Sequence, residues 1–145
     1  MTYSWFKEYP EGVPQEINTE EYSSINDILE QSFKKYSDRP SFSNYGKEYT
    51  YSEIDVLSRK FGSYLQNQLG LVKGDRVAIM MPNVIQYPIA LFGILRAGLV
   101  AVNVNPLYTE RELEHQLNDA GAKTIVIFTN SCHILEKVVD KTPIE

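Results

Sequence analysis

Cys132, His115 and His133 are the residues whose side chains could most directly serve catalysis. A cysteine attacks a substrate as the thiolate and needs a base that takes its proton. His133 follows Cys132 directly, and adjacent residues on a helix point about 100° apart because a turn takes about 3.6 residues. We therefore interpret Cys132 as structural, and His115, which has no identifiable oriented partner, as a packed or surface histidine. No Cys/His cluster has the spacing of a zinc site.

Three carboxylates, Glu110, Glu112 and Glu114, crowd the start of a predicted helix. The helix dipole stabilises negative charge there, and this structural explanation is sufficient without a catalytic role. Ligands of parallel α/β sheets bind at the carboxyl ends of the strands. By position alone, residues 82–83, 105–108 and 129–131 are the places to inspect for ligand contacts.

Phosphate-binding loops are missing from the sequence. Neither G-x-G-x-x-G nor G-x-x-x-x-G-K-[ST] occurs, and the first predicted strand is followed by Met81-Pro82-Asn83 instead of a glycine-rich turn. The Rossmann and P-loop hypotheses fail on this ground. We assign no catalytic and no metal-binding residue, and we identify no cofactor-binding residue.

The elements that would position any such site follow a strand–helix alternation. Apolar runs predict strands near residues 76–81, 99–104 and 124–128, and helical periodicity lies between them. Continuous apolar strands of this kind are typical of a parallel sheet that is buried on both faces. We predict an α/β fold with a partial, doubly wound, mainly parallel sheet, preceded by a helix and a β-hairpin near 41–51 that turns at Gly46.

Helix starts are predicted from capping residues followed by an acid or amide three positions later. The predicted caps are Ser24, Ser52, Asn83 and Thr109. Pro88 lies inside the third of these helices, so we expect a kink there or a start near Pro88 itself. Apolar spacing predicts a last helix from Ser131 to Lys141, and a fourth strand is expected after Glu145. Residues 1–23 are interpreted as an extended leader that packs on something larger.

Composition narrows the class of protein. The chain has 145 residues and a net charge of −5, and it contains no run of Lys and Arg that would favour nucleic acid. The N-terminus lacks the apolar core of a Sec-type signal peptide. The most apolar stretch, residues 87–104, is interrupted by Arg96 and two glycines, which indicates buried core and not a membrane span. A single cysteine fits a reducing compartment.

Two motifs resemble those of the adenylate-forming superfamily. Thr50-Tyr51-Ser52-Glu53-Ile54 resembles its T-Y-x-E-L motif, and residues 95–106, LRAGLVAVNVNP, resemble its K-A-G-x-x-x-x-P motif. Lys73-Gly74-Asp75-Arg76-Val77 lies between them. The chain is similar to bacterial long-chain fatty acid–CoA ligases at residues 80–83, 86–88, 90–98, 103–121 and 135–143, and even in the leader from Trp5 to Ile17.

The resemblance implies that residues 24–145 are the first part of an N-terminal AMP-binding (adenylation) domain, incomplete at its C-terminal end. It implies a ligase that joins a long-chain fatty acid to CoA with ATP and Mg²⁺ through an acyl-adenylate. The phosphate loop and catalytic lysine of that family lie further along the chain, so the fragment itself is expected to be inactive and to bind none of these ligands. A cytoplasmic location, a homodimer and a peripheral contact with the inner face of the cell membrane are further expectations.

Two alternatives stay open at this stage. The first is another adenylate-forming enzyme, such as an aryl- or short-chain acyl-CoA ligase or an adenylation domain, because acyl selectivity is decided outside these residues. The second is a non-catalytic α/β module for binding or assembly. The mass of the natural gene product would distinguish the module, near 16.6 kDa, from an enzyme several times larger.

Overall fold

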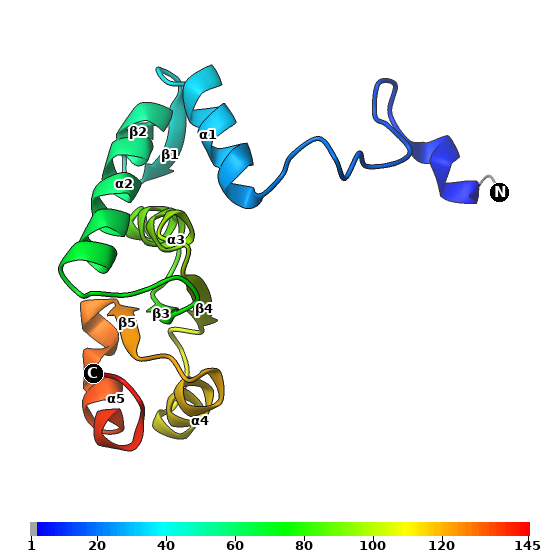
Figure 1. Cartoon of the computed structure of the whole chain (residues 1–145). Helices are drawn as coiled ribbons and strands as arrows, with labels where there is room; N and C mark the ends of the chain where they lie inside the picture. Colours follow the sequence, from blue (N-terminus) through cyan, green and yellow to red (C-terminus); the bar gives the residue numbers. More distant parts are fainter. Residues whose placement is uncertain (1–2) are drawn as a thin grey trace.

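A three-stranded parallel sheet forms the centre of the molecule, which we describe for residues 3–145 from a computed structural model (Figure 1). Its strands lie in the spatial order β4 (Val100–Val104), β3 (Arg76–Met80) and β5 (Thr124–Ile127). Both neighbours run parallel to β3. The three predicted strands are therefore confirmed, with ends that differ from the prediction by about one residue, the usual uncertainty of such boundaries.

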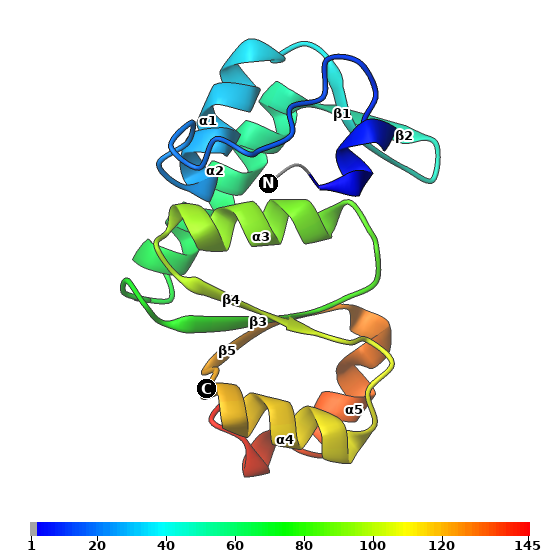
Figure 2. The ribbon, with the colours of Figure 1, turned by 90° about the vertical axis from the view of Figure 1, so that its right-hand side faces the viewer.

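Helices cover both faces of this sheet, as predicted (Figure 2). On one face lies α3 (Gln86–Arg96), and α1 (Ile25–Lys35) and α2 (Tyr51–Asn67) pack against its outer side. On the other face lie α4 (Glu110–Ala120) and α5 (Cys132–Glu136). This arrangement confirms the doubly wound α/β fold.

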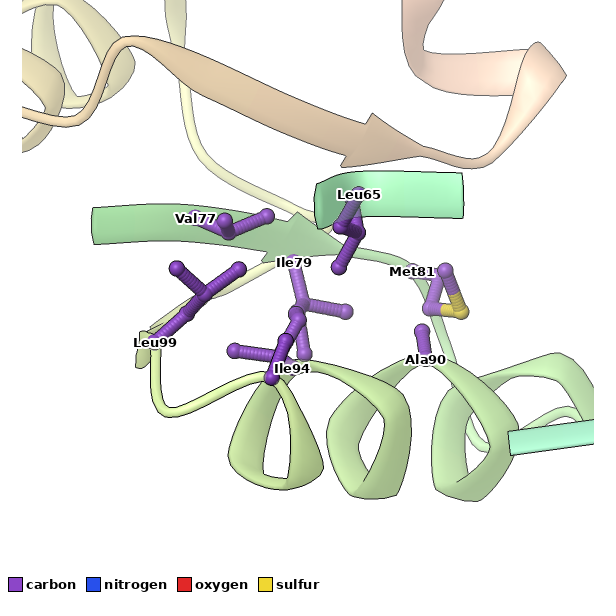
Figure 3. Close-up of a cluster of buried hydrophobic side chains, with 8 residues drawn as sticks. Leu65, Val77, Ile79, Met81, Ala90, Ile94 and Leu99 are labelled. Atoms are coloured by element: carbon purple, nitrogen blue, oxygen red, sulfur yellow. The ribbon is translucent and has the colours of Figure 1, made fainter. Parts of the chain in front are cut away.

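Alternate side chains of β3 enter two separate cores, because successive residues of a strand point to opposite faces. Val77 and Ile79 pack toward α3, where they meet Ile94 and, from α2, Leu65 (Figure 3). The second core contains the buried residues Ala78, Met80, Val104, Leu113, Leu117, Ala122 and Val138. β3 therefore contributes buried side chains to both helical layers. Burying a Val, Leu or Ile side chain fully stabilises the folded state by about 1.5–3 kcal/mol.

The predicted hairpin is confirmed as β1 (Pro40–Asn44) and β2 (Lys47–Thr50), which pair antiparallel. Its two-residue turn consists of Tyr45 and Gly46, and both have a positive φ, 49° and 79°. Such a turn matches the twist of the flanking strands. The leader contains a 3₁₀ helix, η1 (Ser4–Glu8), and two turns, in which the Val13 N–H donates to the Pro10 carbonyl and the Glu21 N–H donates to the Asn18 carbonyl. Residues 1–2, where the predicted leader begins, lie outside the described residues.

The predicted start of α2 is wrong. Thr50, not Ser52, is the N-cap, and its hydroxyl accepts a hydrogen bond from the backbone N–H of Glu53. The Glu53 carboxylate in turn accepts from the Thr50 N–H at 2.8 Å, so two unpaired donors are satisfied reciprocally. Asp55, the expected partner of Ser52, instead binds Arg59 and Arg96.

Asn83 is likewise not a cap. The N-cap of α3 is Ile85, without a side-chain hydrogen bond, and Pro88 is the third helical residue. The first turn of a helix has N–H groups with no partner in the helix, so a proline there removes no hydrogen bond. The helix starts two residues before Pro88, and no kink is needed to accommodate it.

One further prediction needs correction. The last helix, expected from Ser131 to Lys141, is three short pieces: η2 (Thr129–Ser131), α5, and η3 (Val139–Lys141). In α1, only Phe33 is buried, whereas Ile25 and Ile28 are 60% and 41% exposed. The predicted caps Ser24 and Thr109 are confirmed by hydrogen bonds to the N–H groups of Asp27 and Glu112.

Among the described residues, no helix combines the length and the apolar character needed to cross a membrane.

Candidate functional site

The carboxyl edge of the sheet brings the three predicted ligand positions together. Met80 is level with Val104 on one side and with Ile127 on the other, so the loops after β3, β4 and β5 leave the same edge. The ladder continues one step into the last loop, where the Phe128 N–H donates to the Met80 carbonyl at 2.9 Å. This is the edge at which α/β sheets of this kind bind ligands.

A polar bridge links α3, β4 and α4 beside this edge. The Tyr87 hydroxyl donates to Asn103 Oδ1 at 2.9 Å, and Gln116 Nε2 donates to the Asn103 carbonyl at 2.9 Å. The remaining amide oxygen of Gln116 is buried without a partner among the described residues. The two hydrogen bonds of the bridge tie α3 and α4 to β4 beside the edge.

Residues 105–108 form a closed turn. Asn105 Oδ1 accepts the Leu107 N–H at 3.0 Å, and the Asn105 carbonyl accepts the Tyr108 N–H at 3.1 Å. This is the local side-chain turn that asparagine favours. Tyr108 packs into the second core, whereas the Leu107 side chain is 86% exposed. The turn therefore presents an apolar side chain, and no charged one, at the edge of the sheet.

A cavity of about 270 Å³ lies between the hairpin and the loop after β3. Tyr87 and Asn83 belong to its wall, and the Asn44 amide donates to the Asn83 carbonyl at 3.4 Å. The full lining is Phe42, Ser43, Asn44, Asn83, Val84, Ile85, Tyr87 and Pro88. Because none of these side chains is charged, the cavity offers nothing to neutralise a phosphate. Sequence reasoning missed it, since hairpin and loop are distant in the chain.

The histidines and the cysteine are not assembled into a site. His115 is exposed on α4, and the His133 ring nitrogen Nδ1 lies 2.8 Å from the Asn130 carbonyl oxygen. Cys132 is exposed, and its Sγ contacts the Phe128 carbonyl at 4.0 Å. The thiol therefore lies outside both cores, and the nearest imidazole in sequence is bound to a backbone carbonyl.

The three carboxylates at the start of α4 have structural partners. Glu112 accepts hydrogen bonds from the hydroxyl and the N–H of Thr109, and these bonds hold the pKa of its carboxyl below the usual value. Glu110 binds Lys137, and the hydrogen bond and charge of Glu110 raise the pKa of that ammonium group. Glu114 lies 4.0 Å from Lys141. Within residues 3–145, no group of three His, Cys, Asp or Glu side chains is placed to hold a metal ion.

An ion cluster around Arg96 links α1, α2 and α3. It was not predicted from the sequence. Arg96 Nη2 lies 2.9 Å from Glu30 Oε1 of α1 and 2.5 Å from Asp55 Oδ1 of α2. The guanidinium also lies 4.8 Å from the ring centroid of Phe33. Only 9% of the Arg96 side chain is exposed, whereas the side chains of Asp55 and Glu30 are 25% and 46% exposed, so Arg96 is the buried centre of a cluster whose acids reach the surface.

Comparison with known proteins decides the family. The family model for "AMP-binding enzyme" matches residues 29–145, which include the whole sheet and all its covering helices except the first turn of α1. The chain belongs to the AMP-binding enzyme family. The resemblance stated from its motifs is thereby confirmed.

The AMP-binding relatives include proteins several times longer than this chain. It is 60% identical over all 145 residues to the long-chain-fatty-acid–CoA ligase of Escherichia coli O157:H7, of which it spans 26%. It is 42% identical over 122 residues to the long-chain-fatty-acid–CoA ligase of Bacillus subtilis, covering 84% of this chain and 21% of that protein. It is 33% identical over 123 residues to 4-coumarate–CoA ligase 1 of Narcissus pseudonarcissus, covering 82% of this chain and 22% of that protein.

Solved AMP-binding structures agree with the fold. A long-chain-fatty-acid–CoA ligase from Archaeoglobus fulgidus superposes with a TM-score of 0.75 at 28% identity, over 84% of this chain and 26% of that one. An anthranilate–CoA ligase in complex with anthranoyl-AMP superposes with a TM-score of 0.79 at 23% identity, over 84% of this chain and 23% of that one. At this level of identity the likeness supports the fold alone.

Both AMP-binding motifs occupy structural positions in this chain. The first supplies Thr50 and Glu53 of the capping box and Ile54, which is fully buried. The second supplies Arg96 of the ion cluster and Gly98, whose φ of 75° ends α3 in a conformation that favours glycine. These contacts give the named motif residues structural roles in this chain.

Proposed function

We propose that these residues are the N-terminal part of a long-chain fatty acid–CoA ligase. The observation that carries the proposal is the match to the E. coli ligase, 60% identical along the entire chain, leader included. The same chain is only 33% identical to 4-coumarate–CoA ligase over 123 residues. This difference favours a long-chain fatty acid over an aromatic acid as the substrate.

The proposed reaction has two steps. A fatty carboxylate oxygen attacks the α-phosphorus of ATP, and pyrophosphate leaves, which gives an acyl-adenylate. The CoA sulfur then attacks the acyl carbon as the thiol loses its proton, and AMP leaves with the bonding electrons. Activation is needed because a carboxylate is a poor acyl donor, whereas the mixed anhydride has AMP as a good leaving group.

The part of the chain described here contributes architecture to this reaction. Its three level strand ends and the Tyr87–Asn103–Gln116 bridge hold one edge of the domain in a fixed shape. Mg²⁺ would offset charge on the ATP phosphates, but residues 3–145 offer no suitable set of carboxylates. We therefore assign no step through the metal to this chain, and we expect residues 1–145 alone to be inactive.

The substrate class is tested with the full-length protein and a panel of acids. With ATP and CoA, we expect palmitate and oleate to consume the CoA thiol at least about a hundredfold faster, per concentration of acid, than acetate or 4-coumarate, because each methylene that an apolar site buries contributes about 0.8 kcal/mol. Loss of free thiol measures the rate. Turnover of acetate or 4-coumarate but not of palmitate would overturn the long-chain assignment and keep the family. A natural gene product near 16.6 kDa would instead favour the non-catalytic module.

We also propose a cytoplasmic location, with a homodimer and a peripheral contact with the inner membrane face as further elements. The free, exposed thiol of Cys132 fits a reducing compartment. ATP and CoA, the proposed co-substrates, are polar and need an aqueous side from which to enter, whereas a long-chain acid partitions into lipid.

A further inference from the structure

The cavity between the hairpin and the loop after β3, which we call the hairpin cavity, is lined mainly by apolar surface. Figure 2 shows the hairpin over the end of α3 that this loop reaches. Among the lining residues, Pro88 is buried and Phe42, Val84 and Tyr87 are half-buried, whereas Asn83 is exposed. The more buried part of the wall is therefore apolar or aromatic, and a neutral amide group lies nearer to the solvent.

Two aromatic rings of this wall are held in place by contacts outside the cavity. Phe42 of β1 packs against Phe92 of α3, with 6.2 Å between the ring centroids. The Tyr87 hydroxyl donates to Asn103 Oδ1 at 2.9 Å. The cavity is thus formed before any ligand enters, so a ligand would not have to order these two rings on binding.

The charge of the lining restricts the ligand. The hairpin cavity has no charged side chain in its wall, and burying a charged group without a partner is costly. A cavity of about 540 Å³ between α4 and the last turns of the chain differs, because its wall includes Glu110, Arg111, Glu114, Lys137 and Lys141. The part of a ligand that enters the hairpin cavity should therefore be uncharged.

The size of the cavity suits a segment of an alkyl chain. An apolar protein cavity of about 150 Å³ holds one benzene molecule. By the same proportion, the volume of about 270 Å³ holds about ten carbon atoms. A long-chain fatty acid would place its methyl end inside the cavity, and the rest of the molecule, with its carboxylate, would lie outside.

The cavity lies beside the edge of the sheet at which ligands of this fold bind. Asn83 belongs to the loop that leaves the carboxyl end of β3, and Tyr87 is bonded to Asn103 near the end of β4. Among the ligands of the proposed reaction, the fatty acid has a long uncharged chain, whereas ATP and CoA carry phosphates. The apolar cavity and the acid therefore match in chemistry and in place.

We propose that the hairpin cavity binds the methyl end of a long-chain fatty acid. The choice of this acid rests on the proposed function. The alkyl chain of the substrate and that of a second fatty acid molecule have the same chemistry, so the site is assigned to the alkyl chain, and kinetics separate the two sources.

Photolabelling of the full-length protein locates the alkyl chain. A long-chain acid with a diazirine at its methyl end should label residues 42–44 or 83–88, as mass spectrometry of the peptides will show, and excess palmitate should prevent the labelling. The matched probe, with the diazirine next to the carboxyl group, should label residues outside these two ranges. Labelling by the methyl-end probe only at other residues would overturn the proposal.

Val84→Trp fills the cavity with a larger side chain. It should reduce the methyl-end label at least about tenfold, because each methylene that is excluded lowers the affinity about fourfold. Ser43→Trp, at an exposed position of the same lining, repeats the test with less disturbance of the fold. Val56→Trp on α2, which is 48% exposed and outside this lining, is the control and should leave the label unchanged. Full labelling of both cavity variants would contradict the proposal.

Turnover of acids of different length separates the two sources. If the bound acid is the substrate, both cavity variants should lower kcat/KM for palmitate about tenfold more than for octanoate, which has fewer methylenes to bury. If it is a second molecule, the label is lost and this ratio is unchanged. Labelling needs no turnover. A protein that is labelled in the cavity but forms no acyl-CoA from any long-chain acid would therefore contradict the proposed function and not the site.

Discussion

Gly93→Ala is expected to lower the free energy of unfolding by about 3 kcal/mol, the upper end of the range for overpacked cores. Helix propensity alone predicts the opposite, a gain of about 1 kcal/mol. The contact decides the sign, because a Cβ on Gly93 would lie 2.7 Å from Phe61 Cδ1 and 2.9 Å from the Ser58 carbonyl oxygen. The neighbouring helix crosses at Gly62, where a Cβ would lie 2.8 Å from the Gly93 carbonyl oxygen.

Urea denaturation followed by circular dichroism measures this effect. Gly62→Ala should be destabilising to a similar degree, because backbone atoms cannot move aside as a side-chain end can. Lys60→Ala, on the exposed face of α2, is the matched control and should change the stability by less than about 0.5 kcal/mol. A Gly93→Ala protein as stable as the parent would show that α2 and α3 do not approach as closely as described.

Arg96→Met should cost about 2–3 kcal/mol of unfolding free energy. Removing one partner from a buried ion pair costs about 3–5 kcal/mol, and the figure is smaller here because the side chains of Asp55 and Glu30 are 25% and 46% exposed. Arg96→Lys should lower the free energy of unfolding by less, because lysine keeps the positive charge. It should still destabilise, because lysine lacks the planar guanidinium, which also donates to the Asp55 carbonyl at 3.2 Å.

Arg59 offers the control for this cluster. It binds the same two carboxylates, but 55% of its side chain is exposed. Arg59→Met should therefore cost less than about 1 kcal/mol. Equal losses for Arg59→Met and Arg96→Met in the same urea titration would mean that burial of Arg96 adds nothing, and that the cluster is not what holds α1 to α3.

Local signals that agree with the tertiary contacts could be predicted from the sequence. The strands around 76–81, 99–104 and 124–128 are apolar on both faces, and the Thr109–Glu112 capping box is complete, so both predictions are confirmed. The prediction that Ser52 caps α2 is wrong because Thr50 and Glu53, which have the same spacing two residues earlier, form the capping box and satisfy each other's backbone N–H groups. Periodicity could not reveal that Ser131–Lys141 breaks into short turns.

Contacts between distant segments were beyond sequence reasoning. Gly93 lies in an apolar helix, but only the structure shows that Gly62 of α2 crosses it there. The Tyr87–Asn103 hydrogen bond and the cavity beside the hairpin join segments with no local signal. The loops at 82–83, 105–108 and 129–131 could be placed at one edge because the direction of parallel strands fixes it. A ligand for these loops could not be predicted, because no residue type in them specifies a particular ligand.

ATP–pyrophosphate exchange is the most direct test of the claim that this chain begins an adenylate-forming, long-chain ligase. The full-length protein should incorporate labelled pyrophosphate into ATP when palmitate is present and CoA is absent, because the first step is reversible and precedes thiol attack. Residues 1–145 alone should incorporate none. Exchange by the isolated chain would mean that these residues contain a complete nucleotide site. No exchange by an active full-length protein with any long-chain acid would contradict the acyl-adenylate and, with it, the function proposed here.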